Sequence, residues 1–394
     1  MTISNVAKAE IGEPAGPAFE KMLPIVDPEG LPGEEFLEDV RKIIASKQLT
    51  NGKYVREFEE EAAAYLGVKH CVAVSSCTSG LLLVLRCLNL QGEVILPSFT
   101  FHATAHAVVW NGLKPVFADC DADTFCVDTA AVREQITART AAILGVHIFG
   151  NPAPVLKLKE TSERLGIALV FDAAHAFGSK SDGKCVGGFG TAEVFSFSPT
   201  KLVVGGEGGL IATHDDRLAG QLRAGRNYGD AGNYDPELVG INARMGEINA
   251  ALALRGMGSV DWRVTRRNEI RKRYERNLRD VAGIRFQRVA EGGLSSFKDF
   301  SVIVNERAFG RTRNWLMSEL RRNNIDTRKY FSPPVHLQRL YCEVRDKRPL
   351  PVTEEISNGI VSLPIYSSLA DESVDRICDV IRRAQQTGRS RGSE

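Results

Sequence analysis

Short apolar segments alternate with amphipathic ones over roughly residues 30–255. Strands are predicted at 70–76, 92–98, 114–120, 140–150, 167–178, 193–198 and 208–214, where compact apolar runs are bounded by Gly, Pro or polar residues. Helices are predicted at 79–90, 101–112, 128–136 and 153–166, and two more lie within 33–67, separated by a turn at Thr50–Gly52. Buried strands between amphipathic helices indicate an α/β fold with a mostly parallel seven-stranded sheet.

The rest of the chain predicts two further units. Residues 1–25 are small and polar without periodicity, and we interpret them as an N-terminal arm that is mobile or lies against a partner. Residues 26–255 form the large domain. After a helical stretch, the apolar segments 297–305 and 359–369 flank a helical segment at 313–324. This βαβ-like order predicts a smaller α+β C-terminal domain over 256–394.

Composition excludes several classes of function. The 394 residues include 50 basic and 49 acidic side chains, a net charge of +1, so nucleic acid is not an expected partner. The basic run at 263–280 interleaves acidic residues at helical spacing, which indicates a solvated helix face. With no signal peptide and no apolar run of about 18 residues, a cytoplasmic protein without membrane association is expected. The eight cysteines lack metal-binding spacing, so no metal site is expected.

Ligands of an open α/β sheet bind beyond the carboxyl ends of its strands, so the polar residues at those ends are candidates for chemistry. The first strand leads into the small residues of segment 75–80, which either bind a phosphate at a helix N-terminus or simply cap that helix. The second leads to Phe101, which could stack on a flat ring or pack in the core. Asp172 follows five apolar residues, where it meets a cation or caps a helix.

Lys201 lies between two apolar strands, beside a loop with four glycines. Burial lowers the pKa of a lysine and favours the neutral amine, which a lysine needs to form a Schiff base. Glycines let a planar cofactor approach the backbone. A lysine, an aspartate, an aromatic ring and a phosphate-binding loop are the residue set expected around pyridoxal 5′-phosphate (PLP).

The sequence resembles the DegT/DnrJ/StrS family of fold-type-I PLP-dependent aminotransferases, most of which act on keto sugars of nucleotide sugars. The resemblance extends over nearly the whole chain and includes "VILPSFTFHATAHAV", "KPVFADCDADTF", "FDAAHAFGS", "FSFSPTK…GEGG", "GRNYG" and "GINARMGEINAALAL". It implies a Schiff base on Lys201, a pairing of Asp172 with the pyridine nitrogen, and stacking of Phe101 on the ring. It places His175 beside the ring, where relatives often have glutamine.

The same resemblance implies that Thr78, Ser79 and Ser196 bind the cofactor phosphate. It also implies that Asn227, of "RNYG", reaches the phosphate in the other subunit of a homodimer with shared active sites. Two residues depart from the family pattern: Cys77 replaces the usual glycine before the phosphate-binding threonine, and Gly80 replaces an alanine. Backbone N–H groups bind the phosphate, so these changes preserve the function while weakening the assignment of Thr78 and Ser79.

The implied reaction moves an amino group from L-glutamate to the keto group of a nucleotide-linked sugar, with the C-4 keto-6-deoxy type favoured. Three alternatives stay open: a keto-cyclitol acceptor, a PLP-dependent sugar dehydratase, and a non-catalytic regulatory protein. Dehydratase relatives replace the lysine with histidine, and Lys201 argues against that alternative. Tyr330 and His336 are candidate substrate contacts in the C-terminal domain, where their alternative role is packing.

Overall fold

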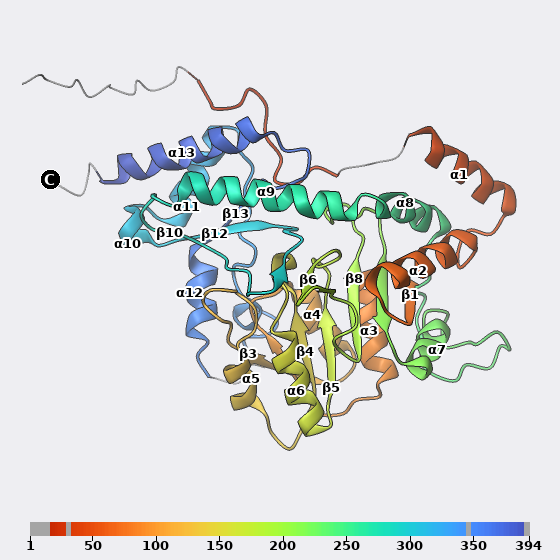
Figure 1. The fold of residues 1–394 in the computed structure, drawn as a ribbon. Coiled ribbons are helices and arrows are strands. Elements are labelled where there is room, and N and C mark those ends of the chain that lie inside the picture. Colours follow the sequence, from red (N-terminus) through yellow and green to blue (C-terminus); the bar gives the residue numbers. More distant parts are fainter. Residues whose placement is uncertain (1–15, 29–32, 344–347, 390–394) are drawn as a thin grey trace, which may run out of the picture.

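The computed structural model describes residues 16–28, 33–343 and 348–389. Its centre is a seven-stranded sheet with helices on both faces (Figure 1). In spatial order the strands are β1 (His70–Val74), β9 (Gly209–Thr213), β8 (Ala192–Ser196), β5 (Ala168–Asp172), β4 (Thr140–Val146), β2 (Glu93–Pro97) and β3 (Lys114–Ala118). Strand β9 pairs antiparallel with both neighbours, and the other pairs in this sheet are parallel. The predicted mostly parallel seven-stranded sheet is confirmed.

Eight helices accompany this sheet. They are α1 (Glu34–Ser46), α2 (Lys53–Leu66), α3 (Cys77–Cys87), α4 (His102–Trp110), α5 (Thr129–Gln135), α6 (Val155–Leu165), α7 (Asp216–Gly225) and α8 (Glu247–Met257). Alternate residues of a strand point to opposite faces, so Leu210 and Ala212 join the core with α2 and α8, whereas Ile211 joins the core with α3, α4 and α7. Both faces of the sheet are therefore buried, which explains the continuous apolar runs of its strands.

A buried glutamate joins two of these helices. Glu247 opens α8 and is only 2% exposed. Its carboxylate accepts hydrogen bonds from the backbone N–H groups of Gly52 (2.7 Å), Tyr54 (2.9 Å) and Val55 (3.1 Å), at the start of α2. A carboxylate at this end of a helix satisfies N–H groups that have no acceptor inside the helix. The predicted break between the first two helices is thus fixed by a residue far along the chain.

The C-terminal part contains a three-stranded antiparallel sheet. Its strands are β10 (Ile284–Phe286), β12 (Phe300–Val304) and β13 (Ile360–Leu363), and its helices are α9 (Val260–Leu278), α10 (Glu306–Phe309), α11 (Arg313–Arg322), α12 (Pro351–Gly359) and α13 (Asp371–Arg389). Strands β12 and β13 pair antiparallel, with Phe300 opposite Leu363. The chain passes through both α11 and α12 before β13, which lets the strand enter from the opposite end. The boundary between 255 and 256 stays a prediction.

A third, small sheet joins the two parts of the chain. It consists of β6 (Lys180–Ser181), β7 (Lys184–Cys185) and β11 (Gly293–Leu294), and the sequence pattern did not predict it. No helix among the described residues is both long enough and apolar enough to span a bilayer.

The predicted N-terminal arm lies partly outside the described residues, which begin at residue 16. Its described part packs against the C-terminal part. Phe19 is 9% exposed, and the guanidinium of Arg376 lies 4.4 Å from the centre of its ring. Leu23 forms a bridge with Ile325, and the carbonyl of Ile25 accepts the N–H of Ile365 at 3.2 Å. This stretch is anchored instead of free.

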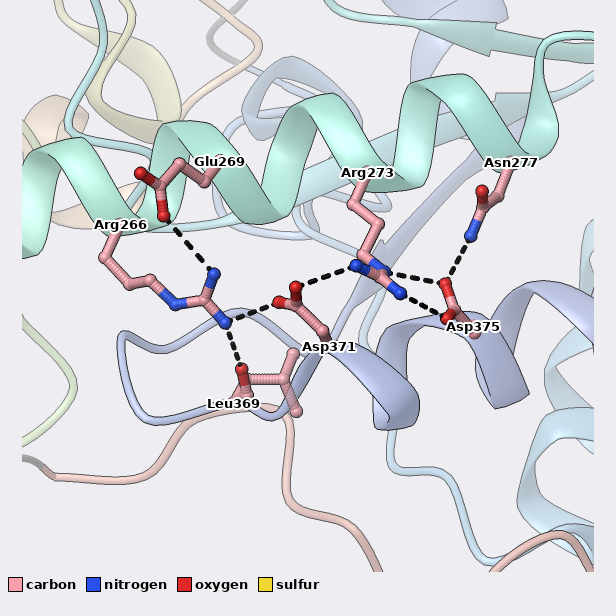
Figure 2. Close-up of polar contacts among 7 residues, drawn as sticks. All are labelled: Arg266, Glu269, Arg273, Asn277, Leu369, Asp371 and Asp375. Carbon is pink, nitrogen blue, oxygen red and sulfur yellow. Dashed lines mark hydrogen bonds and ion pairs between the residues drawn. The ribbon is translucent and has the colours of Figure 1, made fainter.

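Helix α9 carries the basic run, and it lies along α13 (Figure 1). Figure 2 shows Arg266 and Arg273 of α9 on either side of Asp371, at 2.6 and 2.7 Å. Arg273 also binds Asp375 through its Nε at 2.7 Å. On another face of α9, Arg267 is 2% exposed and donates to the carbonyl of Phe297 at 3.2 Å. The interpretation of this run as a solvated face is therefore wrong for these arginines, because helical spacing alone does not show what packs on each face.

Candidate active site

A cavity of about 300 Å³ lies at the carboxyl ends of β1, β4, β5 and β8, where the large and C-terminal parts meet. The predicted site residues that line it are Thr78, Phe101, Asp172, His175, Ser196, Lys201 and Tyr330. Three other predicted residues, Ser79, Asn227 and His336, do not line it. The cavity therefore brings together most of the residues selected from the strand ends.

Asp172 ends β5 with its carboxylate facing the cavity and is 6% exposed. Its Oδ2 accepts a hydrogen bond from Thr104 Oγ1 at 2.7 Å, and its Oδ1 accepts one from the N–H of Ala174 at 3.1 Å. The thiol of Cys77 lies 3.8 Å from Oδ1. The described residues that directly follow Asp172 form turns and then β6, not a helix, so the helix-cap alternative does not hold. A carboxylate positioned this firmly in a recess is suited to bind a cation.

Lys201 lies in the loop between β8 and β9. Its N–H donates to the carbonyl of Ser198 at 3.0 Å, and the N–H of Gly205 donates to the carbonyl of Phe197 at 2.7 Å. The last glycine, Gly209, touches the first turn of α3, because a Cβ there would lie 2.4 Å from the carbonyl carbon of Ser76. This glycine therefore lets the lysine loop pack against α3.

The amine of Lys201 has a pKa well below that of a lysine in water. Burial, followed by the charge of Lys298, lowers the pKa of Lys201 to about 8, from an ordinary value of 10.5. Among the described residues, no hydrogen bond or ion pair holds its Nζ. A much larger share of this amine is therefore neutral at physiological pH than for a lysine in water, and the neutral form is the nucleophile.

His175 lies on the loop after β5, between aromatic rings. Its Nδ1 accepts the backbone N–H of Phe149 at 3.2 Å, so a neutral ring carries its proton on Nε2. Burial, together with the charges of Lys201 and Lys298, lowers the pKa of His175 well below 6.5. The ring of Phe331 stacks nearly parallel to His175, at 6.4 Å between centres. His175 is therefore a neutral hydrogen-bonding group at the edge of the cavity.

The start of α3 can bind an anion. The Oγ of Ser76 accepts the N–H of Ser79 at 3.1 Å, and the Oγ of Ser79 accepts the N–H of Ser76 at 3.0 Å. Ser79 thus maintains the cap, as the N-cap alternative required, and its side chain does not reach the cavity. The N–H groups of Cys77 and Thr78 have no acceptor inside the helix, and the hydroxyls of Thr78 and Ser196 lie on the same cavity.

Two predicted residues lie elsewhere. Asn227 follows α7 outside the cavity, and its Oδ1 accepts a hydrogen bond from Arg244 at 2.5 Å. His336 is 1% exposed, with Nδ1 at 2.5 Å from Ser98 Oγ and Nε2 at 3.4 Å from Glu354. The packing alternative describes His336, and this placement does not support the predicted substrate contact.

Lys298 and Asp299 line the cavity but were missed in the sequence. They are 5% and 4% exposed, and Lys298 Nζ lies 2.8 Å from Asp299 Oδ1. Two adjacent opposite charges inside the apolar segment "FKDFSVIVN" were the available signal. Glu207 and Phe331 also line the cavity and were not selected.

The profile of the DegT/DnrJ/EryC1/StrS aminotransferase family matches residues 32–382. The chain belongs to this family. Its members and structural neighbours are PLP-dependent aminotransferases of fold type I, so the protein is an aminotransferase and the resemblance is confirmed.

Individual relatives align with nearly the whole chain. The dTDP-4-amino-4,6-dideoxy-D-glucose transaminase of Escherichia coli is 31% identical over 92% of this chain and 98% of its own. A crystal structure of DesI in the presence of its TDP-sugar product is 36% identical, with a TM-score of 0.90 and 96% of each chain covered. DesV of S. venezuelae, solved in complex with a ketimine intermediate, is 32% identical, with a TM-score of 0.88, covering 93% of this chain and 99% of its own.

The cavity lining of this family member fits the PLP that the family uses. PLP has a cationic ring nitrogen, an aldehyde, a flat ring and a phosphate. The cavity holds a firmly positioned carboxylate on Asp172, a partly neutral amine on Lys201 and an aromatic ring on Phe101. The free N–H groups and hydroxyls at the start of α3 suit the phosphate. Each chemical feature of the cofactor thus has a matching group.

Proposed function

We propose that this protein binds PLP and transfers an amino group from L-glutamate to the keto group of a nucleotide-linked sugar, with a C-4 keto-6-deoxy sugar as acceptor. The observation that carries the proposal is the partly neutral amine of Lys201, in the same recess as the carboxylate of Asp172. When bound, PLP supplies an aldehyde that accepts the amino group and a ring that withdraws electrons from the reacting carbon.

Each of the cavity residues would have a separate role toward the cofactor. Lys201 would attach the cofactor and, once released, carry a proton to and from the reacting carbon. Asp172, oriented by Thr104, would pair with the ring nitrogen and keep it protonated. Phe101, which is 48% exposed at the cavity mouth, would cover one face of the ring, with His175 beside it.

The phosphate would bind at the start of α3. Thr78 and Ser196 would donate hydroxyl groups, and Ser79 would act by holding the cap that presents the N–H groups. Tyr330, which lines the cavity from the C-terminal part, is the proposed substrate contact.

Relatives support the acceptor. The Escherichia coli relative is named for a 4-amino sugar linked to dTDP, and DesI was solved with a TDP-sugar product. The likeness covers nearly all of each chain, so the region that shapes the acceptor site is included. We therefore propose that this chain also uses a nucleotide sugar as acceptor. The name of the E. coli relative supports amination at C-4. We also expect a cytoplasmic enzyme.

We further propose a homodimer with shared active sites. Asn227 lies outside the cavity of its own chain, beside Arg244 and the half-exposed ring of Tyr228. The guanidinium of Arg244 lies 5.3 Å from the centre of that ring. The resemblance to the family supports a second chain that receives Asn227 at its own phosphate site.

The test uses purified protein loaded with PLP. L-Glutamate should remove the yellow colour of the bound cofactor, and a keto nucleotide sugar should restore it while gaining an amino group, detected by mass spectrometry. Lys201→Ala should neither bind the cofactor covalently nor turn over. Testing 4-keto and 3-keto nucleotide sugars together with inososes separates the C-4 acceptor from the keto-cyclitol alternative. A wild-type protein that ignores PLP would overturn the proposal and favour the regulatory alternative.

A further inference from the structure

Lys298 is a buried cation in the cavity to which the proposed function assigns no ligand. It lies on the segment that leads into β12 and reaches the cavity from the C-terminal part. Its side chain is 6% exposed, and its Nζ lies 2.8 Å from Asp299 Oδ1 and 5.3 Å from the centre of the Tyr330 ring. Burying an ammonium is costly unless partners replace its lost water, and Asp299 accepts one of its three N–H donors.

Lys298, Lys201 and Asp172 all line the same cavity. Burial and then the charge of Lys298 lower the pKa of Lys201, and burial together with the charges of Lys201 and Lys298 lowers the pKa of His175. Cys77 and Asp172 are in direct contact at 3.8 Å, and Asp299 lies 4.0 Å from His175. The amine of Lys201 therefore shares its cavity with the carboxylate of Asp172 and with the Lys298–Asp299 pair.

An amino-acid donor that reacts in this cavity brings the negative charge of its α-carboxylate with it. An α-amino acid carries its carboxylate on the same carbon as the amino group that reacts, so the carboxylate arrives beside the amine of Lys201. A carboxylate without a partner in such a recess is strongly disfavoured. Lys201 is itself committed to the cofactor, and no arginine lines the cavity among the described residues. Lys298 is the remaining lysine of the described lining.

We propose that Lys298 binds the α-carboxylate of the amino-acid donor and makes the site selective for α-amino acids over amines that lack this group. The proposal rests on the aminotransferase function proposed above. Asp299 is a positioning residue: it holds the ammonium in place and, as an adjacent carboxylate, stabilises the cation while the site is empty. The C-terminal part thereby recognises the donor, while the large domain holds the reacting groups.

The test compares two donors that differ by one carboxylate. L-Glutamate and 4-aminobutanoate are each used to remove the colour of the PLP-loaded enzyme in single-turnover experiments, with wild type, Lys298→Gln and Lys298→Arg. Lys298→Gln should lower kcat/KM for L-glutamate by about 10- to 100-fold more than for 4-aminobutanoate, as expected for loss of a charged hydrogen bond. Lys298→Arg, which keeps the cation, should retain most of the preference.

Two further variants distinguish a loss of donor binding from an effect on folding. Lys298→Gln leaves the carboxylate of Asp299 without its cation, so the double variant Lys298→Gln/Asp299→Asn is compared with it and should show the same loss of preference. Lys329→Gln removes an exposed lysine beside Tyr330 and should leave the preference unchanged. Equal losses for the two donors in Lys298→Gln and in the double variant would overturn this proposal and leave the proposed function standing. A wild-type enzyme that accepts no amino group from any donor would overturn the proposed function and this inference together.

Discussion

The lysine that carries the proposed chemistry should lower the stability of the protein without its cofactor. The pKa of Lys201 falls from 10.5 in the unfolded chain to about 8 in the folded one. At about 1.36 kcal/mol per pKa unit, this corresponds to about 3.4 kcal/mol of unfavourable free energy at neutral pH. Lys201 is only partly buried, so screening by solvent reduces the expected cost to about 2 kcal/mol.

The sign follows from proton binding. Between pH 8 and 10.5 the unfolded chain holds a proton on this lysine that the folded chain has lost, so stability rises with pH in that window. Below about pH 8 the full cost is present, and above about pH 10.5 both states are neutral and the cost disappears. Lys201→Met, which replaces the ammonium with an unbranched apolar side chain one atom shorter, should therefore stabilise the apoprotein by about 2 kcal/mol at pH 7 and by much less at pH 10.

Urea unfolding of the apoprotein at both pH values, at one protein concentration, measures the difference. Lys329→Met is the matched control, because Lys329 is exposed and its replacement should change the free energy of unfolding by the same small amount at both pH values. If Lys201→Met were no more stable than wild type at pH 7, or if its advantage were the same at pH 10, burial of the Lys201 ammonium would not be what destabilises the apoprotein.

Two further predictions concern contacts away from the amine. Thr104→Val removes the hydroxyl that donates to Asp172 Oδ2 and should lower the single-turnover rate by about 10-fold, with Thr104→Ser restoring it; an undiminished Thr104→Val rate would contradict this role. Arg273→Met removes the pairs with Asp371 and Asp375 and should lower the free energy of unfolding by about 1 kcal/mol, measured by urea unfolding. The Arg266 and Arg273 hydrogen bonds lower the pKa values of these two carboxylates, so this contribution is present above about pH 3.8 and lost on acidification below it, and about 1 M salt should also weaken it.

The fold could be predicted from the sequence where a segment decides its own structure. The seven apolar runs lie on the seven strands of the main sheet because a strand buried on both faces consists mainly of apolar residues. An apolar composition does not show in which direction a strand runs. The segment "GGLIATH" is equally apolar read either way, and only the structure shows that β9 runs antiparallel to its neighbours. Two-residue strands such as β6 and β7 are too short to carry any periodic pattern.

The site residues also differ in how far the sequence alone could identify them. Asp172 and Lys201 could be found because a charge placed within or directly after an apolar run needs a reason. Ser79 and His336 could not be judged in this way, because small or neutral polar groups can be satisfied by local partners that the sequence does not reveal. Whether such a side chain faces a cavity or a neighbour depends on packing between elements, which no local pattern records.

The pKa of Lys201 illustrates why this limit matters for function. The loop that presents Lys201 connects β8 and β9 of the seven-stranded sheet, but a cation that lowers its pKa, Lys298, comes from the segment before β12 in the C-terminal part. The reactivity of the amine therefore depends on how the two parts are docked, and the α9–α13 contacts in Figure 2 help to order the C-terminal part internally. A change that shifted Lys298 away from the cavity would raise the pKa of Lys201 toward its ordinary value and reduce the share of neutral amine, without touching any residue that binds the cofactor.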